Sequence, residues 1–217
     1  MKDNQCQHII WDWNGTLVND AWLFVELMNE ELDVRNLPLI DVAAYREHFT
    51  FPVKKYYENL GFNFEKENFK EVGYNFIQKF KKRKFEAQLF PNIIQLLTIA
   101  NQKGIKQSIV SAQENNLLNE TVKHYKVNHY FQSISGIEHY YADNKIQIAK
   151  NLREKINFPN KNIVIIGDSS HDFDVAQTLG VECILFAGGH YSKERLQKNN
   201  CLIINQHNEL KDIILKY

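Results

Sequence analysis

Two hydrophobic patterns alternate along the chain. Uninterrupted apolar runs of three or four residues, such as 9–11 and 163–166, are typical of buried strands. Between such runs, apolar residues recur every three or four positions, which predicts amphipathic helices. This alternation predicts a doubly wound α/β core, in which helices cover both faces of a parallel, Rossmann-like sheet.

Turn-forming residues set the expected limits of these elements. Pro91 suits the first turn of one helix, and Gly104 and Gly180 suit the ends of two helices. Strands are expected over residues 7–13, 106–110, 162–166, 182–187 and 201–204, while 130–137 fits either a short strand or a loop. Helices are expected over 91–103, 114–125, 143–156, 171–179 and 192–198. The strand carboxyl ends should carry the functional site, as in other open parallel sheets.

Residues 18–86 carry only the helical pattern. Asn19 or Asp20 can cap a helix whose apolar positions recur as far as Leu32. Further helices are expected over 39–48, 53–60 and 66–84, separated by Pro38, Pro52 and Gly61. We therefore predict a helical domain of residues 18–86, inserted into an α/β core of residues 1–17 and 87–217.

Composition places the chain among soluble globular proteins. It has 217 residues, 44% of them apolar and 24% charged, enough for one core or a core with a small insert. The net charge of zero argues against a general nucleic-acid or membrane-surface binder. No apolar run is long enough to span a bilayer. Nothing in the sequence predicts an oligomeric state.

The cysteines indicate a reducing compartment. Cys6, Cys183 and Cys201 lack the spacing of a metal site, and the last two lie in apolar runs that predict buried thiols. No apolar signal segment follows residues 1–5. We therefore expect a cytoplasmic protein.

Acidic residues follow two of the predicted strands. Asp12 ends the first strand, just before the strand-breaking pair Asn14-Gly15, and Asp168 ends the strand 162–166. Asp172 follows at the start of a predicted helix. Hard cations such as Mg²⁺ bind carboxylate and carbonyl oxygens. Two buried strands that end in carboxylates predict one shared cation site.

These residues also resemble the motifs of a known family. Asp12-Trp13-Asn14-Gly15-Thr16-Leu17 resembles the first motif of the haloacid dehalogenase superfamily, Asp-x-Asp-Gly-Thr-Leu. Ser111 resembles the second motif, Lys145 the third, and the segment 167–172 the fourth. Order and spacing match, so the resemblance covers the whole chain. The architecture is most similar to that of phosphoglycolate-phosphatase-like members, whose helical cap covers the active site and chooses substrates.

The resemblance implies a phosphatase. It implies Mg²⁺-dependent hydrolysis of a small phosphate monoester through a covalent aspartyl-phosphate at Asp12. Ser111 would donate a hydrogen bond to a phosphoryl oxygen, and Lys145 would offset negative charge and position the nucleophile. The expected Mg²⁺ ligands are Asp12, the backbone carbonyl of Asn14, Asp168 and, directly or through water, Asp172. The expected partner is a small phosphorylated metabolite.

Substrate contacts are expected from two regions. The turn after Asp12 would offer amide donors, and a Pro-broken turn of the cap could reach into the cleft. Phe49 and Phe51 flank that turn. The candidate substrate-binding residues are Gly15, Thr16, Ala112, Arg46, Lys54 and His190.

One position departs from the family pattern. Asn14 replaces the second Asp of the first motif, which in phosphatases of this superfamily protonates the leaving alkoxide. An amide cannot do this, and general acid–base catalysis contributes roughly 10²–10⁴-fold to a rate. Either another group such as His171 or His190 carries the proton, or the substrate has an easily displaced leaving group.

Two further explanations stay open. The chain could belong to relatives that cleave carbon–halogen or carbon–phosphorus bonds, which also lack the second Asp. Dehalogenases need no Mg²⁺ acids, so Asp168 and Asp172 argue against them, whereas the phosphonate-cleaving enzymes use a cap lysine, for which Lys54 or Lys55 is available. Alternatively, the chain could bind a phosphate ligand with reduced or no turnover.

Overall fold

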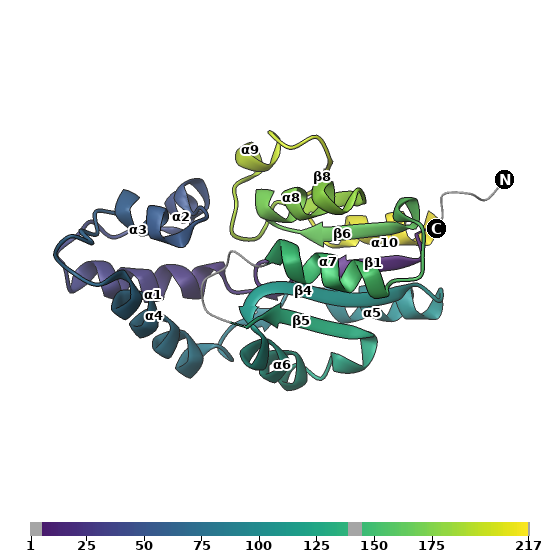
Figure 1. Ribbon diagram of the computed structural model, residues 1–217, viewed down its shortest axis with the longest axis horizontal. Helices are drawn as coiled ribbons and strands as arrows, with labels where there is room; N and C mark the ends of the chain where they lie inside the picture. The colour runs from purple at the N-terminus through teal and green to yellow at the C-terminus, as the bar shows by residue number, and fades with distance from the viewer. Residues whose placement is uncertain (1–5, 139–144, 217) are drawn as a thin grey trace.

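A six-stranded parallel sheet forms the centre of the computed structural model, which describes residues 6–138 and 145–216 (Figure 1). The strand order is β5-β4-β1-β6-β7-β8. These strands are β1 His8–Trp11, β4 Lys106–Glu114, β5 Ser133–Ile137, β6 Ile163–Gly167, β7 Glu182–Phe186 and β8 Leu202–Ile204. The central strand β1 pairs with β4 on one side and with β6 on the other, so that Trp11 is aligned with Ile109 and Ile166. The last residues of distant parts of the chain therefore meet at one edge of the sheet.

Alternate residues of the strands build two separate hydrophobic cores. Ile9 and Trp11 face one core, whereas Ile10 faces the other, as the two-residue period of a strand requires. The core helices are α5 Ile93–Gln102, α6 Asn115–His124, α7 Lys145–Lys155, α8 Ser170–Leu179, α9 Lys193–Leu196 and α10 Asn208–Lys216, with short 3₁₀ turns at Asn128–Tyr130 and Asn160–Asn162. Buried side chains of α5, α6 and α10 pack on the first core, and those of α7, α8 and α9 on the second. The predicted doubly wound α/β fold is confirmed.

Four helices lie beyond the carboxyl end of the sheet (Figure 1). They are α1 Ala21–Asp33, α2 Val42–His48, α3 Val53–Asn59 and α4 Phe69–Arg83. The chain enters this helical segment through β2, Val18–Asn19, and leaves it through β3, Gln88–Leu89, and these two short strands pair antiparallel. Both connections therefore run side by side. The sequence predicted no strand here, because two residues are too few to show a period.

Several elements differ from the expected limits. Strand β4 continues to Glu114 with a register shift after Val110, so Ser111 lies within the strand and not at its end. Helix α10 was not predicted, although Leu210 and Ile214 are buried one turn apart. The expected helix start at 143 lies outside the described residues. The side chain of Cys201 is half-buried, whereas Cys6 and Cys183 are buried, and all three are free thiols.

Within the described ranges, none of the helices combines the length and the hydropathy of a membrane span.

Candidate active site

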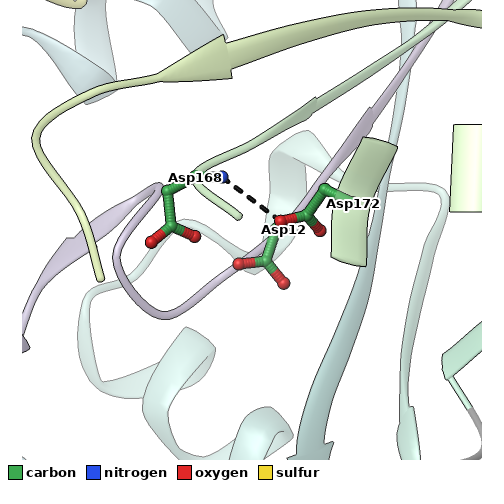
Figure 2. A group of neighbouring side chains, drawn as sticks. All are labelled: Asp12, Asp168 and Asp172. Carbon is green, nitrogen blue, oxygen red and sulfur yellow. Dashed lines mark hydrogen bonds between the residues drawn. The ribbon is translucent and has the colours of Figure 1, made fainter. Parts of the chain in front are cut away.

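Three aspartates meet at the carboxyl edge of the sheet. Asp12 follows β1, Asp168 follows β6, and Asp172 lies in the first turn of α8. One carboxylate oxygen from each lies within 4.8 Å of the others, and all three side chains are buried. Figure 2 shows the three carboxyl groups side by side. Asp12 and Asp168 are more than 150 residues apart in the sequence, and the pairing of β1 with β6 brings them together.

The loop after β1 fits closely beneath this group. Gly15 has a φ of 71°, and a Cβ there would collide with the Asp168 carboxylate and the His190 ring, so only glycine suits the position. The Thr16 hydroxyl lies 3.4 Å from Asp12 Oδ2 and 3.2 Å from Asp168 Oδ1, and therefore bridges the two acids. His207 Nε2 donates to the Thr16 carbonyl at 2.8 Å, which ties the loop to the C-terminal part of the chain.

Asp172 is held by the start of its own helix. Its Oδ2 accepts hydrogen bonds from the Ser169 hydroxyl at 2.6 Å and the Ser169 amide at 3.1 Å. The amide contact is one half of a capping box, in which the Ser169 side chain accepts in turn from the Asp172 amide. The Asp168 amide lies 3.3 Å from the same oxygen, the contact that is dashed in Figure 2. Residues next to Asp172 in the sequence therefore hold one of its two carboxylate oxygens.

One lysine stands between two of the acids. Lys145, at the start of α7, donates to Asp12 Oδ1 and, at 2.5 Å, to Asp172 Oδ1. Burial alone would lower the pKa of Lys145, but the two carboxylates outweigh it and raise the pKa above its ordinary value. The ammonium is therefore charged. Burial would likewise raise the pKa of Asp172, but Lys145 and Ser169 hold it below its ordinary value.

The protein balances the remaining negative charge only in part. Burial raises the pKa of Asp12 from 3.8 to about 8, and the neighbouring carboxylates of Asp172 and Asp168 add to the shift against the opposing effect of Lys145. Burial likewise raises the pKa of Asp168 to about 6. Three buried carboxylates share one ammonium, and all their donor atoms are oxygens. This set suits a hard divalent cation, which would supply the missing positive charge. We call Asp12, Asp168, Asp172 and Lys145 the carboxylate cluster.

A cavity of about 730 Å³ opens above the carboxylate cluster. Its floor comes from the core, and its roof from α1–α4 and the loop between α2 and α3. Of the residues predicted for the site, those that line the cavity are Asp12, Asn14, Ser111, Ala112, Lys145, Asp168, Lys54 and His190. Phe49, Phe51 and His171 line it as well. The register shift of β4 accompanies the exposure of residues 111–113 to this space, since such irregularities re-aim side chains.

Comparison with known proteins identifies the family. The model of the haloacid dehalogenase-like hydrolases matches residues 9–186, most of the chain. The chain belongs to the haloacid dehalogenase-like hydrolases. The predicted family is thereby confirmed, and with it the prediction of a hydrolase. No curated protein sequence matches the chain closely enough to count as a relative.

Several solved structures share the fold over nearly the whole chain. A haloacid dehalogenase-like hydrolase from Streptococcus pneumoniae superposes with a TM-score of 0.82 at 19% identity, covering 96% of this chain and 98% of that one. A predicted phosphoglycolate phosphatase from Haemophilus somnus gives 0.77 at 17%, covering 97% and 99%. CbbY from Rhodobacter sphaeroides, solved with phosphate, gives 0.71 at 17%, covering 95% and 96%. At such identities the likeness establishes the fold alone.

In this hydrolase, a buried acid missed by the sequence analysis stands behind Asn14. Asn14 Nδ2 donates to Asp20 Oδ2 at 2.5 Å, and the Gly15 amide donates to Asp20 Oδ1 at 2.9 Å. Asp20 precedes α1, but its side chain makes no capping hydrogen bond to the helix. The sequence predicted only a helix cap at this position. The signal available was an acid six residues after Asn14, in the same loop.

His190 lies on the other side of Asp20. Its Nε2 is 3.2 Å from Asp20 Oδ1, and its Nδ1 is 2.8 Å from the Tyr45 hydroxyl, so both ring nitrogens are engaged. Burial alone would lower the pKa of His190, but Asp20 outweighs it and raises the pKa. The His190 amide also donates to Asp168 Oδ2 at 2.5 Å. His190 therefore links the cap, the Asn14 loop and the carboxylate cluster.

Arg46 connects the cap to the core and does not line the cavity. Its guanidinium donates to the carbonyls of Gly189 at 2.7 Å and Gly188 at 2.6 Å. Arg195 in turn donates to the carbonyls of Arg46 and Phe49. Of the other predicted residues, Gly15, Thr16 and Asp172 lie beneath the cavity wall and support the residues that form it.

Proposed function

We propose that this hydrolase is a Mg²⁺-dependent phosphatase that cleaves a small phosphate monoester through an aspartyl-phosphate at Asp12. One observation carries the proposal: Asp12 lies at the floor of a cavity, within a buried cluster of three carboxylates that share one lysine. Its carboxylate is the nucleophile that the cavity presents. A covalent intermediate would divide one difficult displacement into two easier ones.

The other residues of the floor suit the same reaction. Lys145 holds Asp12 in place by a charged hydrogen bond and offsets its charge as a phosphate dianion approaches. The Ser111 hydroxyl, which is 2% exposed and lines the cavity, would donate to a phosphoryl oxygen. It accepts the Gln113 amide at 3.1 Å, which leaves its own proton available for the substrate.

The donor set suits Mg²⁺. Asp12 and Asp168 would hold the ion, together with the backbone carbonyl of Asn14, while Asp172 would bind it directly or through water. When bound, Mg²⁺ would neutralise the approaching charges and orient the phosphoryl group. The raised pKa values of Asp12 and Asp168 agree with this assignment, because burial disfavours their charged forms and a bound cation would favour them.

We further propose that residues 18–86 act as a cap domain that selects the substrate. The paired strands β2 and β3 are the only two connections between the described part of α1–α4 and the core, and the cavity lies between the two parts. A cytoplasmic location, which free thiols favour, belongs to the same proposal.

The carbon–phosphorus alternative has less support. A Schiff-base lysine is activated by burial in an apolar pocket or beside another cation. The Lys54 side chain is 53% exposed and lies 3.7 Å from Glu58, and Lys55 is exposed and does not line the cavity. Neither residue is placed as such a nucleophile.

The test measures phosphate release with Mg²⁺ from a panel of phosphate esters and acetyl phosphate. Native protein should turn over, whereas Asp12→Asn should be slower by roughly four orders of magnitude or more, as for the loss of other nucleophiles. Borohydride reduction of the native protein during turnover should convert Asp12 to homoserine, detected by peptide mass. Asp168→Asn should weaken Mg²⁺ binding in a calorimetric titration without substrate.

The role of Asn14 is tested by comparing native protein with Asn14→Asp on the same panel of phosphate esters. If native protein turns over well and Asn14→Asp adds little, another route supplies the proton. If only Asn14→Asp releases phosphate, the native chain is a phosphate-ligand binder and the proposal is wrong. Intact peptide mass must show that Asn14 has not deamidated, since the Asn14-Gly15 pair is prone to this reaction, which would place an aspartate at this position in the native sample.

A further inference from the structure

We propose that the ester cleaved by this hydrolase is an aryl phosphate, a phosphorylated aromatic alcohol without a carboxylate. This inference rests on the proposed function and names its substrate class. It draws on three features of the cavity: its walls, its charges and the groups next to the leaving oxygen.

The roof of the cavity is built from aromatic side chains of every cap helix. Phe24 comes from α1, Tyr45 from α2, Tyr56 from α3, and Phe76 and Phe80 from α4. Rings of this set pack edge-to-face or tilted, with Phe24 and Phe80 centroids 5.1 Å apart and Tyr45 and Tyr56 centroids 5.9 Å apart. A flat aromatic leaving group would extend this packing, because aromatic pairs at such separations attract beyond simple burial.

The charges of the cavity do not suit an acidic leaving group. Among the described lining residues, the lysine and arginine side chains are Lys54, Lys70 and Lys145. Lys54 pairs with Glu58, Lys70 is exposed, and Lys145 is held by Asp12 and Asp172. His190 also lines the cavity, but its ring nitrogens already contact Asp20 and Tyr45. A substrate carboxylate would therefore lose its hydration against an aromatic roof whose described basic groups are paired or exposed, which is costly.

Asn14 and His190, which line the cavity with Asp12, offer little help to a basic leaving oxygen. The Asn14 amide donates to Asp20, and both ring nitrogens of His190 contact Tyr45 and Asp20. The conjugate acid of an alkoxide is about as weak as water, far weaker than a phenol, whose pKa is near 10. A phenolate can therefore leave without a proton donor, and an alkoxide cannot do so readily.

The reaction balances without a general acid. An Asp12 oxygen bonds to phosphorus as the phosphorus–aryl oxygen bond breaks, and the electron pair of that bond leaves on the phenolate. The phenolate takes its proton from water after release. A second water then attacks the aspartyl-phosphate, which restores the Asp12 carboxylate and yields phosphate, and the proton of this water passes to solvent.

Two buried polar groups suggest an uncharged substituent on the ring. The Tyr56 hydroxyl and the Gln113 side-chain amide line the cavity walls, and neither has a hydrogen-bond partner among the described residues. Tyr56 is 1% exposed. An unpaired buried polar group is costly, so a hydroxyl or carbonyl on the ligand that pairs with it would be favoured.

Gly73 marks the space that such a ring would occupy. It lies within α4, where glycine is less favourable than alanine, yet it lines the cavity, and a Cβ there would meet no atom within 4 Å. Gly73→Leu would therefore narrow the cavity without disturbing the fold, and Gly73→Ala is its matched control.

The experiment compares five substrates with Mg²⁺ present, one of them a hydroxylated aryl phosphate. Phenyl and 2-naphthyl phosphate have similar leaving groups but different apolar surface, acetyl phosphate combines an easy leaving group with small size, and phosphoglycolate carries a carboxylate. We expect KM to fall about tenfold from phenyl to 2-naphthyl phosphate, because more apolar surface is buried. Gly73→Leu should reverse this gain but leave acetyl phosphate turnover near that of Gly73→Ala. Tyr56→Phe should raise KM for a hydroxylated aryl phosphate and not for phenyl phosphate.

Binding without turnover separates the two proposals. Benzylphosphonate, which is not hydrolysed, should bind native protein more tightly than phosphonoacetate in a calorimetric titration with Mg²⁺. If phosphoglycolate is the better substrate, or if Gly73→Leu affects all substrates alike, the aryl assignment is wrong and the phosphatase stands. If benzylphosphonate binds but no ester and no acetyl phosphate is cleaved, the phosphatase proposal fails and the aromatic ligand class stands.

Discussion

The carboxylate cluster and the roof of the cavity differ in how they affect the stability of the fold. The cluster buries three carboxylates around a single ammonium, and at Asp12 desolvation outweighs the ion pair with Lys145 and raises the pKa to about 8. The roof buries aromatic rings that contribute about 25 cal/mol for each Å² of apolar surface removed from water. The floor therefore holds charge that a cation and a phosphate can use, while the cap supplies stability and shape.

This contrast assigns chemistry and selectivity to different parts of the sequence. The charged residues come from the ends of β1 and β6 and from the starts of α7 and α8, which the sheet fixes rigidly. The aromatic residues come from helices that reach the core through two short paired strands. Substitutions in the cluster should change stability and metal dependence, whereas substitutions in the roof should change the choice of substrate.

The largest expected effect comes from removing the only cation of the cluster. Lys145→Met leaves three buried carboxylates without an ammonium, so the free energy of unfolding should fall by about 3–5 kcal/mol. Urea unfolding measures this. Mg²⁺ should restore part of the loss, because an ion that binds only the folded state stabilises it. Lys150→Met, at an exposed position of the same helix, should stay within about 0.5 kcal/mol of native protein. Equal losses in both variants would contradict the charge balance described for the cluster.

Lowering the pH should reduce the free energy of unfolding through two buried histidines of the α/β core, His8 and His207. Burial lowers the pKa of His8 and of His207 from 6.5 to about 4. As the pH falls from 6.5 toward 4, the unfolded chain takes up protons that the folded chain does not, so stability is lost across this window. Each histidine accounts for up to about 3 kcal/mol.

His207→Gln isolates one of these contributions. Glutamine keeps an N–H donor for the Thr16 carbonyl but does not titrate. Between about pH 7.5 and about pH 4.5, native protein should lose roughly 3 kcal/mol more than this variant in urea unfolding. Parallel curves for the two proteins would show that His207 is protonated in the folded state.

Substitutions of Asn14 and Asp20 test how the loop after β1 tolerates an amide at the position where the family motif has an aspartate. Asn14→Asp replaces a hydrogen bond to a charged acceptor with two facing carboxylates, and should cost about 1.5–3 kcal/mol at about pH 8. The swapped double variant, Asn14→Asp with Asp20→Asn, restores an amide–carboxylate contact and should recover most of the loss. Additive effects of the two single changes in a double-mutant cycle would show that the residues are not coupled.

The smallest expected effect lies in the roof. Gly73→Ala should raise the free energy of unfolding by about 0.5–1 kcal/mol, because alanine suits a helix interior better than glycine and the added methyl meets no atom. Thermal unfolding at constant Mg²⁺ measures the change. A destabilised variant would mean that the cavity wall closes over this position in solution.

Much of the core followed from local pattern. Apolar runs that end in Asp12 and Asp168 predicted two buried strands, and the structure pairs these two, β1 and β6, with each other at the centre of the sheet. The motif spacing also singled out Ser111 and Lys145, which the structure places at the floor of the cavity. Helix α10 and the paired strands β2 and β3 escaped notice because they are short or lie beyond the last clear period.

The contacts of the cap with the core could not be predicted in the same way. Arg46 was expected to meet the substrate, but its guanidinium binds the carbonyls of Gly188 and Gly189, which are more than 140 residues away. Asp20 was expected to cap α1, but the Asn14 loop and His190 bind its carboxylate instead. In both cases the side chain has hydrogen-bond partners on other elements of the fold, which the sequence around it does not reveal.

The sequence alone determined the family, the fold class and the residues of the carboxylate cluster, because strand periodicity and motif spacing are local properties of the chain. The tertiary structure decided that Lys145 lies between Asp12 and Asp172, that Asp20 supports Asn14, and that aromatic rings from four helices enclose one cavity. These features depend on side-chain directions and on the packing of segments far apart in the chain, which no local pattern encodes.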